Sequence, residues 1–142
     1  MKENKTISFE ELRRQFHLTG LRFTRQREQV YRIFEENSAG YTIAQATEIL
    51  VLQGIGQATV YRTIKALEEL GYLKWVHVQG GEHRFVASRH RHSHMVVCRS
   101  CFKAVECIDC DLAVMEKLIA IRTGFAIEDH HLEFSGLCPD CS

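Results

Sequence analysis

The sequence predicts an α+β fold, in which a helical N-terminal unit ends in a β-hairpin and is followed by a small α/β unit. Apolar residues recur at helical spacing as far as Leu70, and beyond Gly71 they alternate as they do in strands. Gly80-Gly81 separates two such strand-like segments, and glycine suits a tight turn because it tolerates positive φ. All six cysteines fall in the last third of the chain, each in a Cys-x-x-Cys pair. Helices followed by a hairpin give the order of a winged helix-turn-helix, and the paired cysteines indicate a metal-stabilised second unit.

Capping residues mark where the helices of the first unit begin. Ser8 can cap a helix that starts at Phe9, and Glu11 would complete a capping box with it. Thr24 and Thr42 can cap the next two helices, which we expect over residues 24–37 and 42–53. A fourth helix ends at Gly71, and its buried stripe should consist of Val60, Ile64, Leu67 and Leu70.

The second unit follows a polar, histidine-rich hinge. We expect a winged-helix DNA-binding domain over residues 1–88, a hinge over 89–94, and a dimerisation and metal-binding domain over 95–142. Two short strands with a turn between them should precede a helix over 111–124, and a last strand over 125–138 should follow it. The helix should turn its apolar face inward through Leu112, Met115, Leu118 and Ile119. Roughly fifty residues bury too small a core, so this unit needs a metal ion or a partner subunit.

The cysteine pairs provide the means to hold an ion. They are Cys98/Cys101, Cys107/Cys110 and Cys138/Cys141. Two pairs from separate segments complete a tetrahedral zinc site with Zn–S distances of about 2.3 Å, so one pair is left over. The charged N-terminus does not resemble a signal peptide, and no apolar run is long enough to span a membrane. We therefore expect a cytoplasmic protein, in which paired cysteines bind metal more often than they form disulfides.

The fourth helix carries the residues that could read DNA. Formal net charge is zero, so charge alone hardly favours a nucleic-acid partner. In the segment ATVYRT, Tyr61 could touch a thymine methyl and Arg62 a phosphate or guanine edge, with Thr59 and Thr63 beside them. An isolated amphipathic helix would more often carry a solvated polar face, but the helix–hairpin order favours DNA. No arrangement of catalytic side chains stands out, so we do not expect an enzyme.

These segments together resemble the ferric uptake regulator family of metalloregulators. The resemblance runs from about Leu18 to Cys141 and rests on LRFTRQREQVYRIF, GQATVYRTIKALEELGYL, the His-x-His hinge, CRSCFKAVE and GFAIEDHHLEFSGLCPDC. It implies a homodimeric, metal-dependent repressor that closes onto AT-rich palindromic operator DNA. By position, Tyr61 and Arg62 would contact bases and phosphates, and Arg22 would reach the minor groove. The resemblance also implies a structural zinc on Cys98, Cys101, Cys138 and Cys141.

A regulatory ion should bind the closed form better than the open form, so it should join the wing to the second domain. The candidate ligands are His77, His83, His90, His92, His94 and Glu106. The hinge histidines recur with period two and would share one face of an extended strand. Glu106 stands five residues after Cys101, where the family has an acidic ligand. A two-residue hairpin turn would pair His77 with Arg84, whereas a three-residue loop over Gln79–Gly81 would set it opposite His83.

Departures from the family favour zinc as the effector. Gly40-Tyr41 stands where iron-type members have a histidine, and Val86 where many have an acidic or cysteine ligand. An added residue separates His94 from Cys98. The missing loop histidine and the extra thiolate pair favour a zinc-responsive repressor of metal uptake genes, similar to the zinc uptake regulator branch. The added residue leaves open which two of the hinge histidines bind.

Other readings of the sequence stay open. Iron or peroxide sensing within the same family is one alternative, and a zinc-ribbon interaction module without DNA binding is another. Cys107 and Cys110 could serve as a soft ligand reserve or as a redox pair in an enzyme. His130 and His131 could complete a further site or be plain strand residues.

Overall fold

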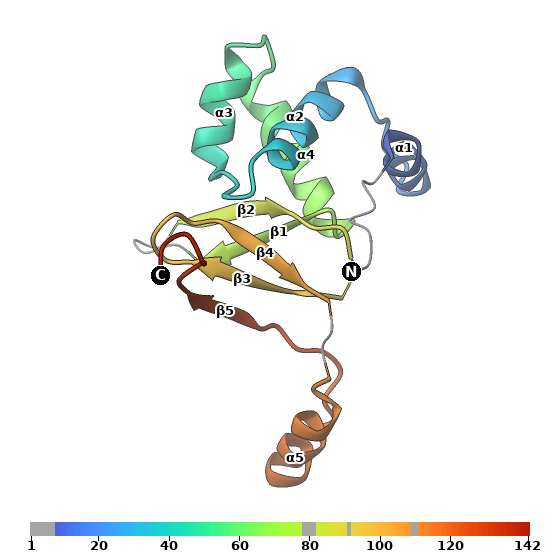
Figure 1. Cartoon of the computed structure of the whole chain (residues 1–142). Coiled ribbons are helices and arrows are strands. Elements are labelled where there is room, and N and C mark those ends of the chain that lie inside the picture. Colours follow the sequence, from blue (N-terminus) through green and yellow to red (C-terminus); the bar gives the residue numbers. More distant parts are fainter. Residues whose placement is uncertain (1–7, 78–81, 91, 109–110) are drawn as a thin grey trace.

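The computed structural model describes residues 8–77, 82–90, 92–108 and 111–142, and it has the predicted α+β order (Figure 1). The helical unit contains α1 (Phe9–Leu18), α2 (Arg25–Glu36), α3 (Ile43–Val51) and α4 (Gln57–Glu69). The wing consists of β1 (Leu73–His77) and β2 (His83–Ala87). The C-terminal unit contains β3 (His94–Cys98), β4 (Ala104–Cys107), α5 (Ala113–Thr123) and β5 (Glu133–Gly136).

The helix starts agree with the predicted capping residues. The Ser8 hydroxyl accepts from the Glu11 N–H at 3.2 Å, so Ser8 caps the helix as predicted. The Glu11 carboxylate binds Arg14 and Gln15 instead, so the predicted capping box does not form. The structure shows a reciprocal capping box at the start of α3, between Thr42 and Gln45, where it was not predicted. On α4 the predicted stripe is fully buried apart from its half-buried last member, Leu70, and it packs into the helical core.

The wing lies between two apolar clusters. Leu73 and Phe85 pack into the core of the helical unit, whereas Val76 and Val86 pack against β3. This alternation follows from the period of two along a strand, which sends successive side chains to opposite faces. In Figure 1 the wing strands accordingly lie between the helices and the C-terminal strands. Each face of the wing therefore packs against one unit of the chain, and the two units are in contact through it.

The two wing strands pair in the register that was predicted for a three-residue loop. β1 and β2 pair antiparallel with His77 opposite His83. The predicted Gly80-Gly81 turn itself lies outside the described residues. Because directly opposed residues point to the same face, the two histidine rings approach with centroids 5.9 Å apart.

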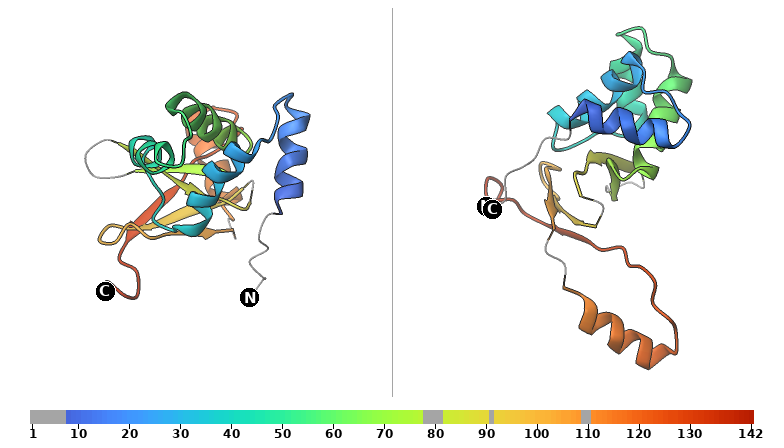
Figure 2. Two further views of the ribbon diagram at one scale, coloured as in Figure 1. Left: turned by 90° about the horizontal axis from the view of Figure 1, so that it is seen from above. Right: turned by 90° about the vertical axis from the view of Figure 1, so that its right-hand side faces the viewer.

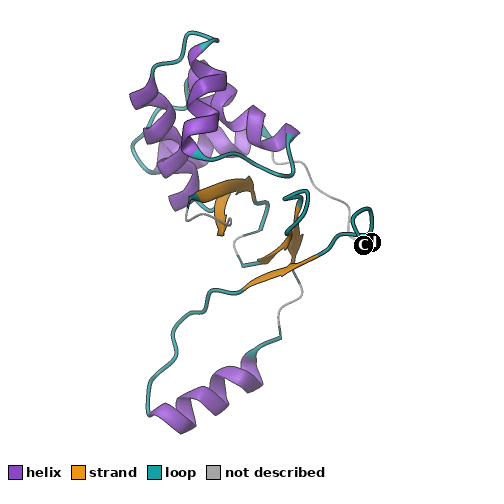
Figure 3. Ribbon diagram, turned by 90° about the vertical axis from the view of Figure 1, so that its left-hand side faces the viewer, coloured by secondary structure: helices purple, strands orange, loops and turns teal. Residues whose placement is uncertain are grey.

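The C-terminal strands form a mixed sheet in the order β4-β3-β5. β3 and β4 are antiparallel and joined by the CRSC turn, as predicted, while β5 runs parallel to β3. A parallel pair needs a long connection, which here contains α5 and an irregular link (Figure 3). The strand predicted over 125–138 is thus confined to Glu133–Gly136.

Helix α5 projects away from the rest of the chain (Figure 2). Its apolar residues Met115, Leu118 and Ile119 are 53%, 49% and 43% exposed, Leu112 just before it is half-buried, and no residue of α5 is buried. The prediction that this face points inward is wrong for the single chain. The physical reason is that α5 projects beyond the sheet, so that no α5 residue joins either hydrophobic cluster of the described residues.

Candidate metal centres and DNA-binding surface

The four cysteines predicted to bind zinc converge at one end of the C-terminal sheet. Their sulfur atoms all lie within 4.8 Å of one another, and we call Cys98, Cys101, Cys138 and Cys141 the cysteine cluster. The Cys101 and Cys138 sulfurs are 3.7 Å apart. Four Zn–S bonds of about 2.3 Å in a tetrahedron put the sulfurs about 3.8 Å apart, so the donors fit zinc.

The charges of the cysteine cluster also favour a cation. The backbone N–H groups of Cys101 and then Cys138 lower the pKa of Cys98 to about 6, because they stabilise its thiolate. The hydrogen bond with Cys138 raises the pKa of Cys141 to about 12. A thiolate thus forms readily at Cys98, whereas ionisation of Cys141 is favoured by a positive charge among the sulfurs.

Cys107, the described member of the left-over pair, is separate from this cluster. Cys107 is exposed at the end of β4, opposite His94 in the register of the sheet. Cys110 lies outside the described residues. The cysteine cluster therefore uses the two pairs that flank the sheet, and the role of Cys107 stays a prediction.

A second convergence of ligands involves His92, His94 and His130, which we call the histidine cluster. Their ring nitrogens lie within 4.8 Å of one another. The Nε2 atoms of His94 and His130 are 3.2 Å apart. Zn–N bonds of about 2.0–2.1 Å in a tetrahedron put the nitrogens about 3.3 Å apart, so these imidazoles fit an ion that they share. The ligands come from the hinge, the first residue of β3 and the link before β5.

Neighbouring groups prepare the histidine cluster for a cation. The Glu116 carboxylate of α5 lies 2.6 Å from Nδ1 of His130, which leaves Nε2 of that ring to face His94. Burial, and next the proximity of His130, lower the pKa of His94. The neutral imidazole is the form that binds metal. The arrangement offers nitrogen donors from three rings, with an acidic group behind one of them.

His130 and Glu116 were not among the predicted ligands, although His130 had been noted as a possible further donor. The parallel pairing of β5 with β3 brings His130 to the hinge, and nothing local in the sequence indicates that pairing. The available signal was a carboxylate on the predicted helix, Glu116, with a histidine, His130, in the segment after it. This signal is weak.

Glu106 and His90 lie apart from the histidine cluster. The Glu106 carboxylate accepts from Ser88, Ser93 and the Arg89 N–H, and it lies 3.2 Å from Nδ1 of His90. Burial raises the pKa of Glu106, but the hydrogen bonds from Ser93, Ser88, Arg89 and His90 together lower it below its ordinary value. Among the described residues, the cysteine and histidine clusters are the groups of three or more potential ligands whose ligand atoms all lie within 4.8 Å of one another.

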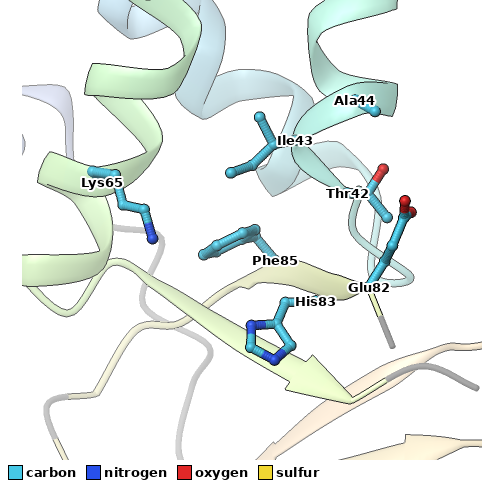
Figure 4. Close-up of a pocket in the computed structure, with 7 residues that line it drawn as sticks. All are labelled: Thr42, Ile43, Ala44, Lys65, Glu82, His83 and Phe85. Carbon is cyan, nitrogen blue, oxygen red and sulfur yellow. The ribbon is translucent and has the colours of Figure 1, made fainter. Parts of the chain in front are cut away.

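The wing histidines face two different hollows. A groove of about 780 Å³ between the wing and the C-terminal unit contains His77, Glu133 and the histidine cluster. His77 contacts Glu133 through both its backbone N–H at 3.1 Å and its Nδ1 at 3.2 Å. His83 stacks on Trp75 and lines a smaller hollow of about 300 Å³ between the wing, α3 and α4, as Figure 4 shows. His77 therefore lines the same groove as the histidine cluster, whereas His83 lines the hollow beside α3 and α4.

The predicted DNA-contacting residues are divided between the surface and the core. Tyr61 and Arg62 of α4 are exposed, as is Arg22 before α2, and Thr59 is half-buried. Thr63 is fully buried, and its hydroxyl donates to the Thr59 carbonyl at 2.7 Å. The structure thus places Thr63 in the core, so its side chain cannot serve as a DNA contact in this conformation.

Comparison with known proteins agrees with this arrangement. The model of the ferric uptake regulator family matches residues 18–135. The chain is 34% identical to the ferric uptake regulation protein of Bacillus subtilis over 139 residues, which covers 92% of each chain. It is 32% identical to that of Legionella pneumophila over 125 residues, covering 86% of this chain and 92% of the relative.

Solved structures of the same kind superpose on the whole chain. A chain described as holo XcZur matches with a TM-score of 0.71 and 25% identity, covering 92% of this chain and 94% of its own. The Helicobacter pylori ferric uptake regulator matches with a TM-score of 0.66 and 19% identity, covering 99% of this chain and 97% of its own. Regulators of this family bind operator DNA as dimers.

The class of protein follows from the matched family and the donor clusters. Each helix among the described residues is too short or too polar to pass through a lipid bilayer. The protein is a transcription regulator and not an enzyme. With its winged helices, its cysteine cluster and its match over most of the sequence, the chain belongs to the ferric uptake regulator family of metal-responsive DNA-binding transcription regulators.

Proposed function

We propose that this protein is a zinc-responsive repressor of metal uptake genes that acts in the cytoplasm. In this proposal residues 1–88 bind DNA, residues 89–94 form the hinge, and residues 95–142 dimerise and bind metal. One zinc ion on the cysteine cluster maintains the fold of the C-terminal unit. A second ion on the histidine cluster controls the affinity for an AT-rich palindromic operator.

The observation that carries the proposal is the convergence of His92, His94 and His130. Imidazole nitrogens suit zinc, whereas sites for manganese or iron usually include carboxylate ligands. Glu116 contacts the ring nitrogen of His130 that faces away from His94, which is the usual position of an orienting carboxylate around zinc. Two of the similar solved structures are described as holo XcZur and as a zinc-bound manganese uptake regulator.

The histidine cluster suggests how an ion would change the protein. Its ligands lie in the hinge, on β3 and on the link that carries α5. An ion bound there fixes the link, and with it α5, relative to the hinge. The ion stabilises the conformation in which these three segments meet, because it binds that conformation more tightly than any other.

Exposed apolar residues support a homodimer. They cover α5 and the outer face of the C-terminal sheet, and include Val96, Val105, Met115, Leu118, Ile119 and Phe134. Large exposed apolar surfaces of this kind usually mark a protein–protein interface. A second copy would bury the face of α5 that this chain leaves exposed, and would set two copies of α4 in a two-fold arrangement that suits a palindrome.

The exposed residues of α4 support the DNA contact. Tyr61 is 50% exposed, and the Lys65 ammonium lies 6.0 Å from the centre of its ring. In the proposal Tyr61 and Arg62 contact bases and phosphates, Thr59 lies beside them, and Arg22 reaches the minor groove. Thr63 is buried and makes no DNA contact in this proposal.

Iron is the second candidate effector, because the relatives at 34% and 32% identity are named ferric uptake regulation proteins. Selecting duplexes from a random library with the zinc-loaded protein gives a probe for both candidates. A reporter controlled by the selected duplex should be derepressed by a zinc chelator and unaffected by an iron chelator. Derepression by the iron chelator alone would assign the effector to iron, and failure to select any duplex would refute DNA-binding repression.

A further inference from the structure

Glu106 contacts several groups of the hinge at once. On Oε1 it accepts hydrogen bonds from the Ser88 hydroxyl at 2.7 Å and the Ser93 hydroxyl at 2.5 Å. On Oε2 it accepts from the Arg89 N–H at 3.1 Å and lies 3.2 Å from Nδ1 of His90. A carboxylate has about four lone-pair sites. These donors occupy the positions that a metal ion would need, so an ion could bind Glu106 only after breaking several of these hydrogen bonds.

Ser93 connects this hydrogen-bonded group to the histidine cluster. Ser93 is buried and stands between His92 and His94. Its backbone carbonyl accepts from the Lys74 ammonium of β1 at 2.9 Å, and its hydroxyl also contacts that ammonium. Successive side chains of an extended segment point to opposite sides. While Ser93 points toward Glu106, its two neighbours point away from Glu106, and their ring centroids lie 5.2 Å apart.

The apolar contacts beside the hinge contain no further ligand. Val76 and Val86 of the wing pack against Met95 and Val97 of β3. Met95 is the register partner of Glu106, so the apolar cluster and the hydrogen-bonded group lie side by side on one face of the sheet. Hydrogen bonds and apolar packing therefore join the wing to the sheet on this side.

We propose that Glu106 is a positioning residue, which fixes the hinge so that His92 and His94 meet His130, and that it does not itself bind the regulatory ion. This inference rests on the proposed regulatory role of the histidine cluster. It predicts that the loss of Glu106 weakens the ion site without changing the atoms that coordinate the ion. Groups that hold coordinating histidines typically contribute tenfold to a hundredfold to metal affinity.

Cobalt provides a spectroscopic test, because its visible absorption reports the identity and geometry of its ligands. Full-length protein with zinc on the cysteine cluster is titrated with Co²⁺, as wild type and as Glu106→Gln, Ser88→Ala and His130→Ala. Glu106→Gln and Ser88→Ala should bind one Co²⁺ with the wild-type spectrum and about tenfold lower affinity. His130→Ala, which removes a ligand, should lose the wild-type spectrum.

Two results would overturn the inference while leaving the histidine cluster in place. In one, Glu106→Gln alters the spectrum as His130→Ala does, so Glu106 is a ligand. In the other, Glu106→Gln binds Co²⁺ as tightly as wild type, so Glu106 does not position the hinge. Zinc content and thermal unfolding control for folding, and if Glu106→Gln does not fold, Ser88→Ala decides by the same criteria. Wild type that binds no Co²⁺ beyond the cysteine cluster would refute the proposed function and this inference together.

Discussion

Replacing Val86 by alanine should destabilise the whole chain, because Val86 joins the wing to the C-terminal sheet. Val86 is 2% exposed and packs with Val76, Met95 and Val97. The change removes two buried carbon atoms, and at about 0.8 kcal/mol for each the transfer term is about 1.6 kcal/mol. The cavity that remains brings the expected loss to about 2 kcal/mol. For a chain of this size the loss corresponds to a fall in Tm of about 6 °C.

The assay is thermal and urea unfolding of the zinc-loaded, full-length protein. Val51→Ala is the matched control, since Val51 lies at the end of α3 and is 51% exposed. The control should lose less than about 0.5 kcal/mol, as surface substitutions usually do. Equal losses in the two variants, or a loss below about 0.5 kcal/mol in Val86→Ala, would refute the packing of the wing against the sheet.

Three further predictions concern other parts of the molecule. Cys138→Ser should lose the structural zinc and unfold the C-terminal unit, as metal analysis and limited proteolysis would show; a variant that keeps one tightly bound zinc on the cysteine cluster would contradict this. Tyr61→Ala should weaken binding to the selected duplex by about 1–3 kcal/mol while sedimentation shows an intact dimer; loss of the dimer would mean that α4 has been misassigned. Burial raises the pKa of Glu35, whose Oε1 is buried without a hydrogen-bond partner in the described part of the chain. Since the folded pKa exceeds the unfolded one, stability contributed by Glu35 is present at acidic pH and is lost as pH rises through the folded pKa. Glu35→Gln should therefore have a higher Tm than wild type at pH 7, and the difference should vanish toward pH 4. Equal Tm values at pH 7 would contradict a raised pKa for Glu35.

Local signals predicted the helical unit well. The caps at Ser8, Thr24 and Thr42 and the buried stripe of α4 depend on contacts within a few residues, which a sequence displays directly. Thr63 was assigned to the DNA face because it lies in a polar run. The structure buries it because α4 packs against α2, α3 and β1, so that its buried face is broader than one stripe.

Long-range pairing limited the prediction of the ion site. The hinge histidines were recognised from their period, but His130 reaches them only because β5 pairs parallel with β3 across a long connection. The register of His77 and His83 depended on a loop length that two alternatives fitted equally well. The inward face predicted for α5 shows the same limit, since an apolar stripe indicates burial but not which chain provides the opposing surface.

In the proposed function, an ion on the histidine cluster controls DNA binding. The most direct test of this control is the zinc-dependent fluorescence anisotropy of the selected duplex with His130→Ala beside His131→Ala. His131 is the adjacent residue, its side chain is 93% exposed, and it lies outside the cluster. We expect His130→Ala to keep its structural zinc but to lose zinc-dependent binding, whereas His131→Ala should respond to zinc as wild type does. Wild-type zinc dependence in His130→Ala would contradict the proposed control.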